Sequence, residues 1–239
     1  MVYSRSTLKH VIIVAGHAVL RNFGDPSAEE NWTLLDFQRG EPSCYIGHIR
    51  RGVELAARNP DSLLVFSGGQ SRREAGRRSE AESYLWVAQY YSWFGMPEVA
   101  AHTLKEEYAR DSFENLLFGI CRFRECTGSF PEQVTFVSWV FKQARFELHR
   151  EAIRWPEKCF RYAGANNPPR LEQALIAERQ TALKYHCDPY SAGPELEAKR
   201  RERNPFERQH PYGRTCPELA ALFEHRGPEL FRGPLPWSA

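Results

Sequence analysis

The feature that most constrains this chain is a series of short, uninterrupted apolar segments separated by segments with helical spacing. Residues 11–15 have the sequence VIIVA and residues 63–66 have the sequence LLVF, and each run is followed closely by glycine. Continuous apolar runs of this length are typical of strands that are buried on both faces, as in parallel sheets covered by helices. The pattern therefore predicts an α/β fold.

The remaining segments extend the same alternation of strand and helix. Further strands are predicted at 101–105, 133–139 and 160–163, and helices at 43–58, 79–94, 111–123, 141–154 and 171–185. Ser79 with Glu82, and Asp111 with Glu114, match the capping signature of a helix start. Alternation at this pace suits right-handed crossovers, so we expect a mainly parallel sheet of about five strands with helices on both faces.

The character of the chain changes after about residue 186. Half of its 16 prolines lie in this last stretch, which also contains Phe206, Tyr212, Phe223 and Phe231. A disordered tail rarely holds so many aromatic residues. We therefore expect residues 1–185 to form the α/β domain and residues 186–239 to form a Pro-rich extension packed on it, with one short helix near 217–225.

The composition limits the classes of partner that the protein can bind and indicates the compartment in which it is found. Lys and Arg number 32 against 30 Asp and Glu, a net charge of +2, which gives no general attraction to nucleic acid or to an anionic membrane. No apolar run approaches the roughly 18 residues that a bilayer requires. The six cysteines are scattered without a CxxC pair, which favours reduced thiols and a cytoplasmic protein. No HExxH motif is present, and no metal site is expected.

Ligands of open parallel sheets bind at the carboxyl ends of strands, which directs attention to the loops that follow the predicted strands. After the first strand, Gly16 allows close backbone approach and His17 is a candidate acid or base. After the second strand, Ser67, Gly68 and Gly69 form a turn whose N–H groups are expected to face an anion. A plain solvated turn explains the same residues.

The helix entrances beyond these loops add polar candidates. They are Ser79 and Glu80 after the second strand, then Arg110, Ser112, Glu114 and Asn115 after the third. Capping and complementarity to the helix dipole explain the acids equally well. After the fourth strand, Lys142 and Arg145 stand three apart, so both can extend from one face near a helix start. Positive charge at a helix start is unfavourable because it opposes the helix dipole, and a bound anion would offset this cost.

Five segments in order carry a resemblance to a known family. They are VIIVAGHA (11–18), FSGG (66–69), SEAES (79–83), ARDSFENL (109–116) and SWVFKQAR (138–145). In these segments the chain resembles the YdcF/SanA/ElyC-like family, known as domain-of-unknown-function family 218. Its Pro-rich end, with CDPYSAG (187–193) and NPF (204–206), resembles the soluble eukaryotic, especially fungal, members. The resemblance implies a Rossmann-like three-layer α/β fold. Lys142 stands where bacterial members usually have His, which leaves an anion-binding role at that position but not an imidazole.

These features predict a protein that binds an anionic small molecule, such as a nucleotide or a ligand resembling S-adenosylmethionine. If the chain is catalytic, phosphoryl-ester hydrolysis or group transfer fits best, with Glu80, Glu114 or His17 as acid or base. The alternative is a non-catalytic scaffold whose C-terminal extension binds another protein. The residues do not identify a protein partner, a substrate or an oligomeric state.

Overall fold

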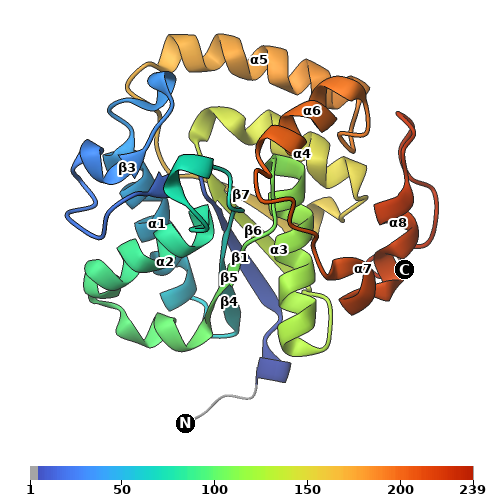
Figure 1. The fold of residues 1–239 in the computed structure, drawn as a ribbon. Coiled ribbons are helices and arrows are strands. Elements are labelled where there is room, and N and C mark those ends of the chain that lie inside the picture. Colours follow the sequence, from blue (N-terminus) through green and yellow to red (C-terminus); the bar gives the residue numbers. More distant parts are fainter. Residues whose placement is uncertain (1–4, 239) are drawn as a thin grey trace.

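Five parallel strands form the centre of the computed structural model, which describes residues 5–238 (Figure 1). They are β1 (His10–Ala15), β4 (Ser62–Ser67), β5 (Thr103–Glu106), β6 (Gln133–Ser138) and β7 (Phe160–Gly164), in the spatial order β5-β4-β1-β6-β7. The central strand β1 pairs in parallel with β4 and with β6, so that His10 lies opposite both Ser62 and Gln133. The predicted α/β fold with a parallel sheet is confirmed.

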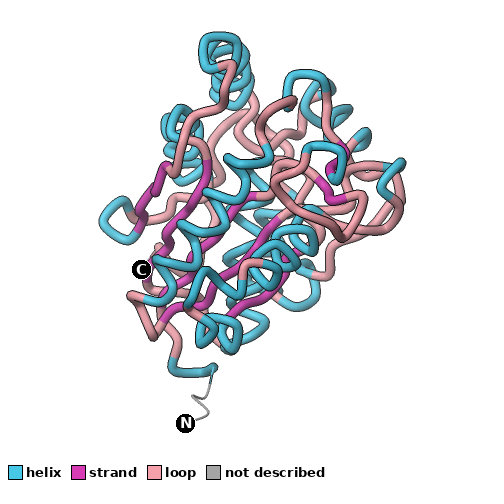
Figure 2. Tube along the Cα trace, turned by 90° about the vertical axis from the view of Figure 1, so that its left-hand side faces the viewer, coloured by secondary structure: helices cyan, strands magenta, loops and turns pink. Residues whose placement is uncertain are grey.

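Helices cover both faces of this sheet, as Figure 2 shows from the side. Ile12 and Val14 pack in one buried cluster with α1 (Pro42–Ala57) and α2 (Glu80–Tyr90). Val11 and Ile13 point the other way, into a cluster with α3 (Ser112–Thr127) and α4 (Gln143–Ala152). Alternate side chains of one strand are therefore buried on opposite faces, which explains the continuous apolar runs in the sequence.

The order of the strands fixes where loops diverge. From β1 the chain moves outward through α1 to β4 and through α2 to β5, and then returns through α3 to β6 on the other side of β1. The crossovers on the two sides of the β1–β6 pair therefore lie on opposite faces of the sheet. In folds of this kind a crevice opens at that point, outside the carboxyl ends of the two strands.

Helix starts follow the predicted caps, and some helix ends differ from the prediction. The hydroxyl of Ser79 accepts the Glu82 N–H at 2.9 Å, and Asp111 Oδ1 accepts the Glu114 N–H at 2.8 Å. Helix α2 ends at Tyr90 rather than near residue 94, because Trp93 and Phe94 adopt left-handed backbone angles with φ of 55° and 53°. An antiparallel pair of two-residue strands, β2 (Val19–Leu20) and β3 (Trp32–Thr33), was not predicted, because the strands are too short to show a period.

The C-terminal part of the chain is more helical than expected. After α5 (Leu171–Cys187) come α6 (Pro194–Glu202), α7 (Tyr212–Thr215) and α8 (Ala220–Glu224), where only one short helix was predicted. Helix α6 buries a single apolar residue, Leu196, so it has no apolar stripe to detect. Its start at a proline and its acidic first turn were the available signals.

The segment after residue 186 packs into the core beneath α3. Tyr190, Tyr212, Phe231 and Leu235 are all buried in the cluster that contains Val11. Tyr190, Tyr212 and Phe231 of this Pro-rich segment therefore belong to the folded core, while Phe206 and Phe223 are partly buried.

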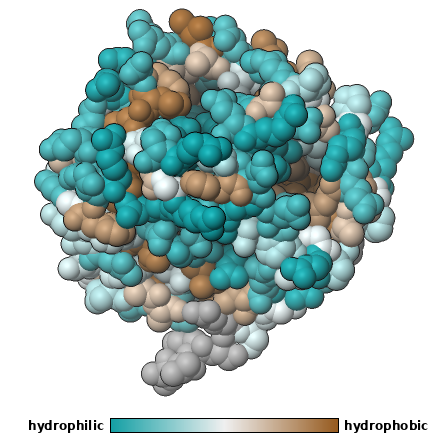
Figure 3. All heavy atoms as spheres, in the orientation of Figure 1, coloured by the Kyte–Doolittle hydropathy of each residue, from teal (hydrophilic) through white to brown (hydrophobic). Residues whose placement is uncertain are grey.

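Three surface and covalent features complete the description. All six cysteines are unpaired, as expected. No helix within residues 5–238 is both long and apolar enough to cross a membrane. The face seen in Figure 3 is mostly hydrophilic, with hydrophobic residues in separate patches rather than in one continuous area.

Candidate functional site

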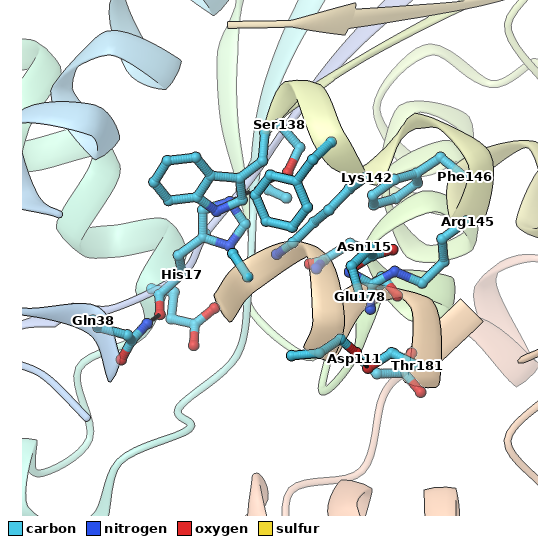
Figure 4. A pocket seen from close by; sticks show the side chains of 18 of the residues that line it. His17, Gln38, Asp111, Asn115, Ser138, Lys142, Arg145, Phe146, Glu178 and Thr181 are labelled. Carbon is cyan, nitrogen blue, oxygen red and sulfur yellow. Dashed lines mark hydrogen bonds and ion pairs between the residues drawn. The ribbon is translucent and has the colours of Figure 1, made fainter. Parts of the chain in front are cut away.

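A cavity of about 340 Å³ lies at the carboxyl ends of β1 and β6, where the crossovers diverge (Figure 4). Its floor comes from the loops after these two strands, including His17 and Lys142, and from the first turn of α3. Its other wall comes from α5 and α6, and in Figure 1 α5 runs across the top of the molecule with α6 beside it. The residues that α5, α6 and the turn after α6 contribute are Ala174, Ala177, Glu178, Thr181, Tyr185, Lys199 and Arg203.

Seven of the thirteen residues predicted for the site line this cavity. They are Gly16, His17, Glu80, Ser112, Asn115, Lys142 and Arg145. Six do not line it, namely Ser67, Gly68, Gly69, Ser79, Arg110 and Glu114. The structure therefore brings together the candidates from the first and fourth loops, but only some of those from the second and third.

The glycines do not present free N–H groups to a ligand. Gly16 N–H donates to the Ser67 carbonyl at 2.7 Å, Gly68 N–H to that of Glu106 at 3.0 Å, and Gly69 N–H to that of Ala109 at 2.8 Å. The expectation of an anion-binding backbone turn is therefore wrong. Glycine is needed here because adjacent loops approach closely: a Cβ on Gly16 would lie 2.5 Å from the Cβ of Glu80.

The two serines of the second loop serve the protein itself. The buried Ser67 hydroxyl donates to Glu106 Oε2 at 2.7 Å, while Ser79 caps α2 and donates to Glu107 at 2.8 Å. Burial raises the pKa of Glu106 to about 7, although the Ser67 hydroxyl and two backbone N–H groups lower it in turn. These hydroxyls are occupied by internal acids and are not available to a ligand.

Arg110 and Glu114 neutralise each other away from the cavity. Glu114 accepts from the backbone N–H of Arg110 at 2.8 Å and from its Nε at 2.9 Å, and Arg200 lies 3.5 Å away. The Glu114 side chain is only 4% exposed. Glu114 therefore lies outside this cavity, and two guanidinium groups hold its carboxylate.

Lys142 is a cation of the cavity that forms no ion pair in the described part of the chain. The residue is half-buried, and no carboxylate within residues 5–238 forms an ion pair with its Nζ. Burial, followed by repulsion from Arg145, lowers the pKa of Lys142 to about 7. Its side chain extends between His17 and Asn115 in Figure 4, where an anion could reach it.

Arg145, by contrast, is paired across the cavity. Its Nη2 donates to Glu178 Oε2 of α5 at 2.8 Å, and the two side chains are 9% and 10% exposed. Arg145 Nε and Glu178 Oε1 have no hydrogen-bond partner in the described part of the chain. Burial raises the pKa of Glu178, although Arg145 and Lys142 act in the opposite direction.

His17 is held as a neutral imidazole at the end of β1. Its Nε2 lies 3.2 Å from the Ser138 hydroxyl, and its ring lies 5.1 Å from that of His48 and 5.6 Å from that of Trp139. Burial, and then Lys142, lower the pKa of His17 well below its usual range. The uncharged imidazole keeps one acceptor nitrogen but is a weaker base than an ordinary histidine.

Two further predicted residues meet internal partners at the cavity wall. Ser112 Oγ lies 2.8 Å from Nε2 of His149, whose pKa is lowered by burial to about 3. Glu80 accepts a hydrogen bond from the Ser71 hydroxyl. Ser112 therefore adjoins a neutral imidazole, and Glu80 offers a carboxylate with one hydrogen-bond donor already in place.

The cavity contains equal numbers of acidic and basic residues, but they are not equally paired. The acids Glu41, Glu80, Asp111 and Glu178 each accept a hydrogen bond from a neighbouring side chain, from Tyr45, Ser71, Arg200 and Arg145 respectively. Of the bases, Arg145 is paired, while Lys142, Lys199 and Arg203 form no ion pair in the described part of the chain. Glu41 and Glu80 accept only from hydroxyl groups, so three cations and two carboxylates of the cavity have no ion-pair partner among the described residues.

Sequence reasoning missed the residues outside the strand-end loops. They are Phe37, Gln38 and Glu41 before α1, Asp111 at the start of α3, Ser138, Trp139, Phe141 and Phe146 around the end of β6, and the α5 and α6 residues given above. Trp139 and Phe141 adjoin a predicted loop and could have been included. No sequence signal places α5 or α6 over the sheet. Within residues 5–238, no group of three or more His, Cys, Asp or Glu residues could hold a metal ion.

Comparison with known proteins gives one relative. The chain is 26% identical over 274 residues to the uncharacterized protein YOR238W of Saccharomyces cerevisiae, an alignment that covers 90% of each chain. No family model matches the chain. No solved structure matches it either.

Proposed function

We propose that this protein binds an anionic small molecule of the nucleotide type in the cavity between the loops after β1 and β6, and that it belongs to the YdcF/SanA/ElyC-like family it resembles. The observation that carries the proposal is the half-buried ammonium group of Lys142, which lines the cavity and forms no ion pair in the described part of the chain. A desolvated cation is unfavourable unless an anion compensates it. Arg203 and Lys199 add unpaired positive charge on the same cavity.

The size and lining of the cavity fit such a ligand. Its volume of about 340 Å³ falls in the range of small-molecule sites. Phe37, Trp139 and Phe141 line it together with the basic residues, so a ligand with a flat ring and a charged group can use both kinds of contact. A nucleotide has this character, and S-adenosylmethionine shares its adenosine part.

A hydrolase or transferase reaction is the catalytic form of the proposal. The neutral His17 would accept a proton, and Glu80, on the same cavity, is the second acid–base candidate. Lys142 would stabilise negative charge that develops on the reacting group.

The test is a thermal-shift screen of nucleotides, sugar phosphates, inorganic phosphate and S-adenosylmethionine against the full chain. A ligand at about 100 times its Kd adds roughly 2.7 kcal/mol to the free energy of unfolding. Lys142→Gln should weaken the affinity for the ligand found by about 10-fold or more, because a charge-assisted hydrogen bond contributes about 1.5–3 kcal/mol.

Lys158→Gln is the matched control, because Lys158 is exposed on the segment before β7 and does not line the cavity. It removes the same charge and should leave the affinity unchanged. The proposal fails if no compound in the panel stabilises the protein, or if Lys142→Gln binds as tightly as the wild type.

A further inference from the structure

Among the described residues, Arg145 and Glu178 form the ion pair whose two members both line the cavity. The two groups come from different elements, Arg145 from the start of α4 and Glu178 from the middle of α5. Both line the cavity, and their contact is a single hydrogen bond of 2.8 Å. Guanidinium and carboxylate can form two parallel hydrogen bonds, so half of the pairing capacity is unused.

The unused atoms are buried. Arg145 Nε and Glu178 Oε1 have no partner among the described residues, although both side chains are about nine-tenths buried. A buried polar atom without a partner costs free energy comparable to a lost hydrogen bond. The pair is therefore a suboptimal arrangement that a better-matched anion on Arg145 would improve.

Helix α5 is held loosely enough to take part in such an exchange. Of its 17 residues, only Glu178 and Tyr185 are buried, and Ile176 and Leu183 are 60% and 66% exposed. Most of the helix therefore contributes little apolar burial, and the pair with Arg145 is one of its few buried contacts. Segments with few buried contacts open at low free-energy cost.

We infer that a phosphate dianion replaces the Glu178 carboxylate on Arg145, with Lys142 as the second cation, and that this exchange weakens the attachment of α5 to α4, leaving the ring contact of Tyr185 with His149 in place. The inference rests on the proposed function and specifies the ligand group that the site selects. A monocarboxylate would offer Arg145 the same group as Glu178 and would have no advantage over it. A phosphate brings a second charge and a third oxygen, which can reach Lys142 while Arg145 is bound bidentately.

The experiment measures binding of inorganic phosphate by isothermal titration calorimetry to the wild type, Glu178→Gln and Glu172→Gln. Glu172 is exposed in the first turn of α5, so Glu172→Gln removes the same charge from the same helix without touching Arg145. We expect Glu178→Gln to bind phosphate at least about 5-fold tighter than the wild type, and Glu172→Gln to bind within about 2-fold of it. Acetate should bind none of the three appreciably.

A second measurement uses the wild type alone and therefore does not depend on the folding of a variant. Hydrogen exchange of residues 171–187 should become faster when phosphate replaces chloride at equal ionic strength, because the Arg145–Glu178 tie to α4 is lost. Adenosine 5′-monophosphate, run in parallel, distinguishes a phosphate ester from free phosphate as the source of the group.

The outcomes separate this inference from the proposed function. If the wild type binds phosphate or the monophosphate but Glu178→Gln binds no tighter, or if exchange in α5 slows or is unchanged, the Glu178 exchange is wrong and the proposed function stands. If a different anion binds in a Lys142-dependent manner and phosphate does not, the Glu178 exchange is again wrong and the proposed function stands. If no anion binds any of the proteins, the proposed function itself is wrong.

Discussion

The carboxyl edge of the sheet has two halves that look alike in sequence and differ in structure. The loops after β4 and β5 are rich in Ser, Gly, Arg and Glu, yet their polar groups bond to one another: Ser67 with Glu106, and Arg110 with Glu114. The loops after β1 and β6 carry fewer polar residues, and theirs, His17 and Lys142, face a cavity. We call these the closed half and the open half.

The difference teaches that polar composition does not by itself locate a site in this fold. On the closed half, the loops after β4 and β5 pack directly against each other, and the N–H groups of Gly68 and Gly69 donate to the carbonyls of Glu106 and Ala109. On the open half, the crossovers diverge between β1 and β6 and leave space between the loops. Strand order, rather than loop composition, decides which half can hold a ligand.

The largest expected effect tests whether the closed half is structural. Glu114→Gln leaves Arg110 and the buried Arg200 with one carboxylate fewer, so the free energy of unfolding should fall by about 3–5 kcal/mol. Urea denaturation measures the change. Glu132→Gln, which breaks the exposed pair with Lys9, should change the free energy of unfolding far less. A clear loss of anion affinity in folded Glu114→Gln would contradict the division into two halves.

A smaller effect compares two serines at equivalent strand ends. Ser67→Ala removes a donor from the fully buried Glu106 and should destabilise the fold by about 1–3 kcal/mol without changing anion affinity. Ser138→Ala removes a 3.2 Å contact with His17 and a hydrogen bond to the Tyr162 hydroxyl, neither of which involves a charged group, and should cost about 1 kcal/mol or less. Thermal unfolding and ligand titration of both variants provide the comparison. An equal cost for the two serines would show that the halves are not distinct in stability.

The smallest expected effect is the pH dependence of anion affinity at the open half. Its charged and titratable neighbours are Arg145 on α4, Glu178 on α5, Arg203 after α6, Glu41 before α1 and the neutral imidazoles of His17 and His48. Because the pKa of Lys142 is lowered to about 7, an anion that binds the protonated amine raises this pKa and takes up a proton. Affinity for sulfate, which stays divalent, should therefore fall above pH 7 by at most tenfold per pH unit. Lys142→Gln should show a flat profile.

Stability of the ligand-free protein should change with pH in the opposite direction. The pKa of Lys142 is about 7 in the folded state against 10.5 for an ordinary lysine, so the unfolded chain binds the extra proton between these values. The reduction that Lys142 causes in the free energy of unfolding is therefore largest below pH 7 and becomes smaller as the pH rises toward 10.5. Lys142→Gln should be stabilising at pH 6, with a gain that shrinks by pH 9; a gain that grew with pH would contradict the assignment.

The sequence alone predicted the architecture because local pattern and burial coincide in it. The runs at residues 11–15 and 63–66 are buried on both faces, and both predicted caps, Ser79 and Asp111, begin helices. It also placed the candidates of the first and fourth loops at one edge of the sheet, where the structure has them. These features depend on neighbouring residues, which a single sequence contains.

The remaining part of the site depends on contacts between distant segments. Glu178 lies 33 residues after Arg145, and nothing in the pattern of α5 marks it as buried. The occupation of the glycine N–H groups likewise depends on carbonyls of other strands and loops, such as that of Glu106. Both results follow from the order of strands and the return of α5 over the sheet.

The cavity wall formed by α5 and α6 has a consequence for the protein during its synthesis. All five strands of the sheet have left the ribosome once Gly164 has emerged, and the loops that end β1 and β6 are complete by then. Arg145 at that stage has no Glu178 above it, and the cavity lacks the wall that Lys199 and Arg203 provide. A nascent chain of this length therefore exposes an unpaired guanidinium at the edge of a finished sheet. Translation of the next 40 or so residues both neutralises that group and creates the enclosed site.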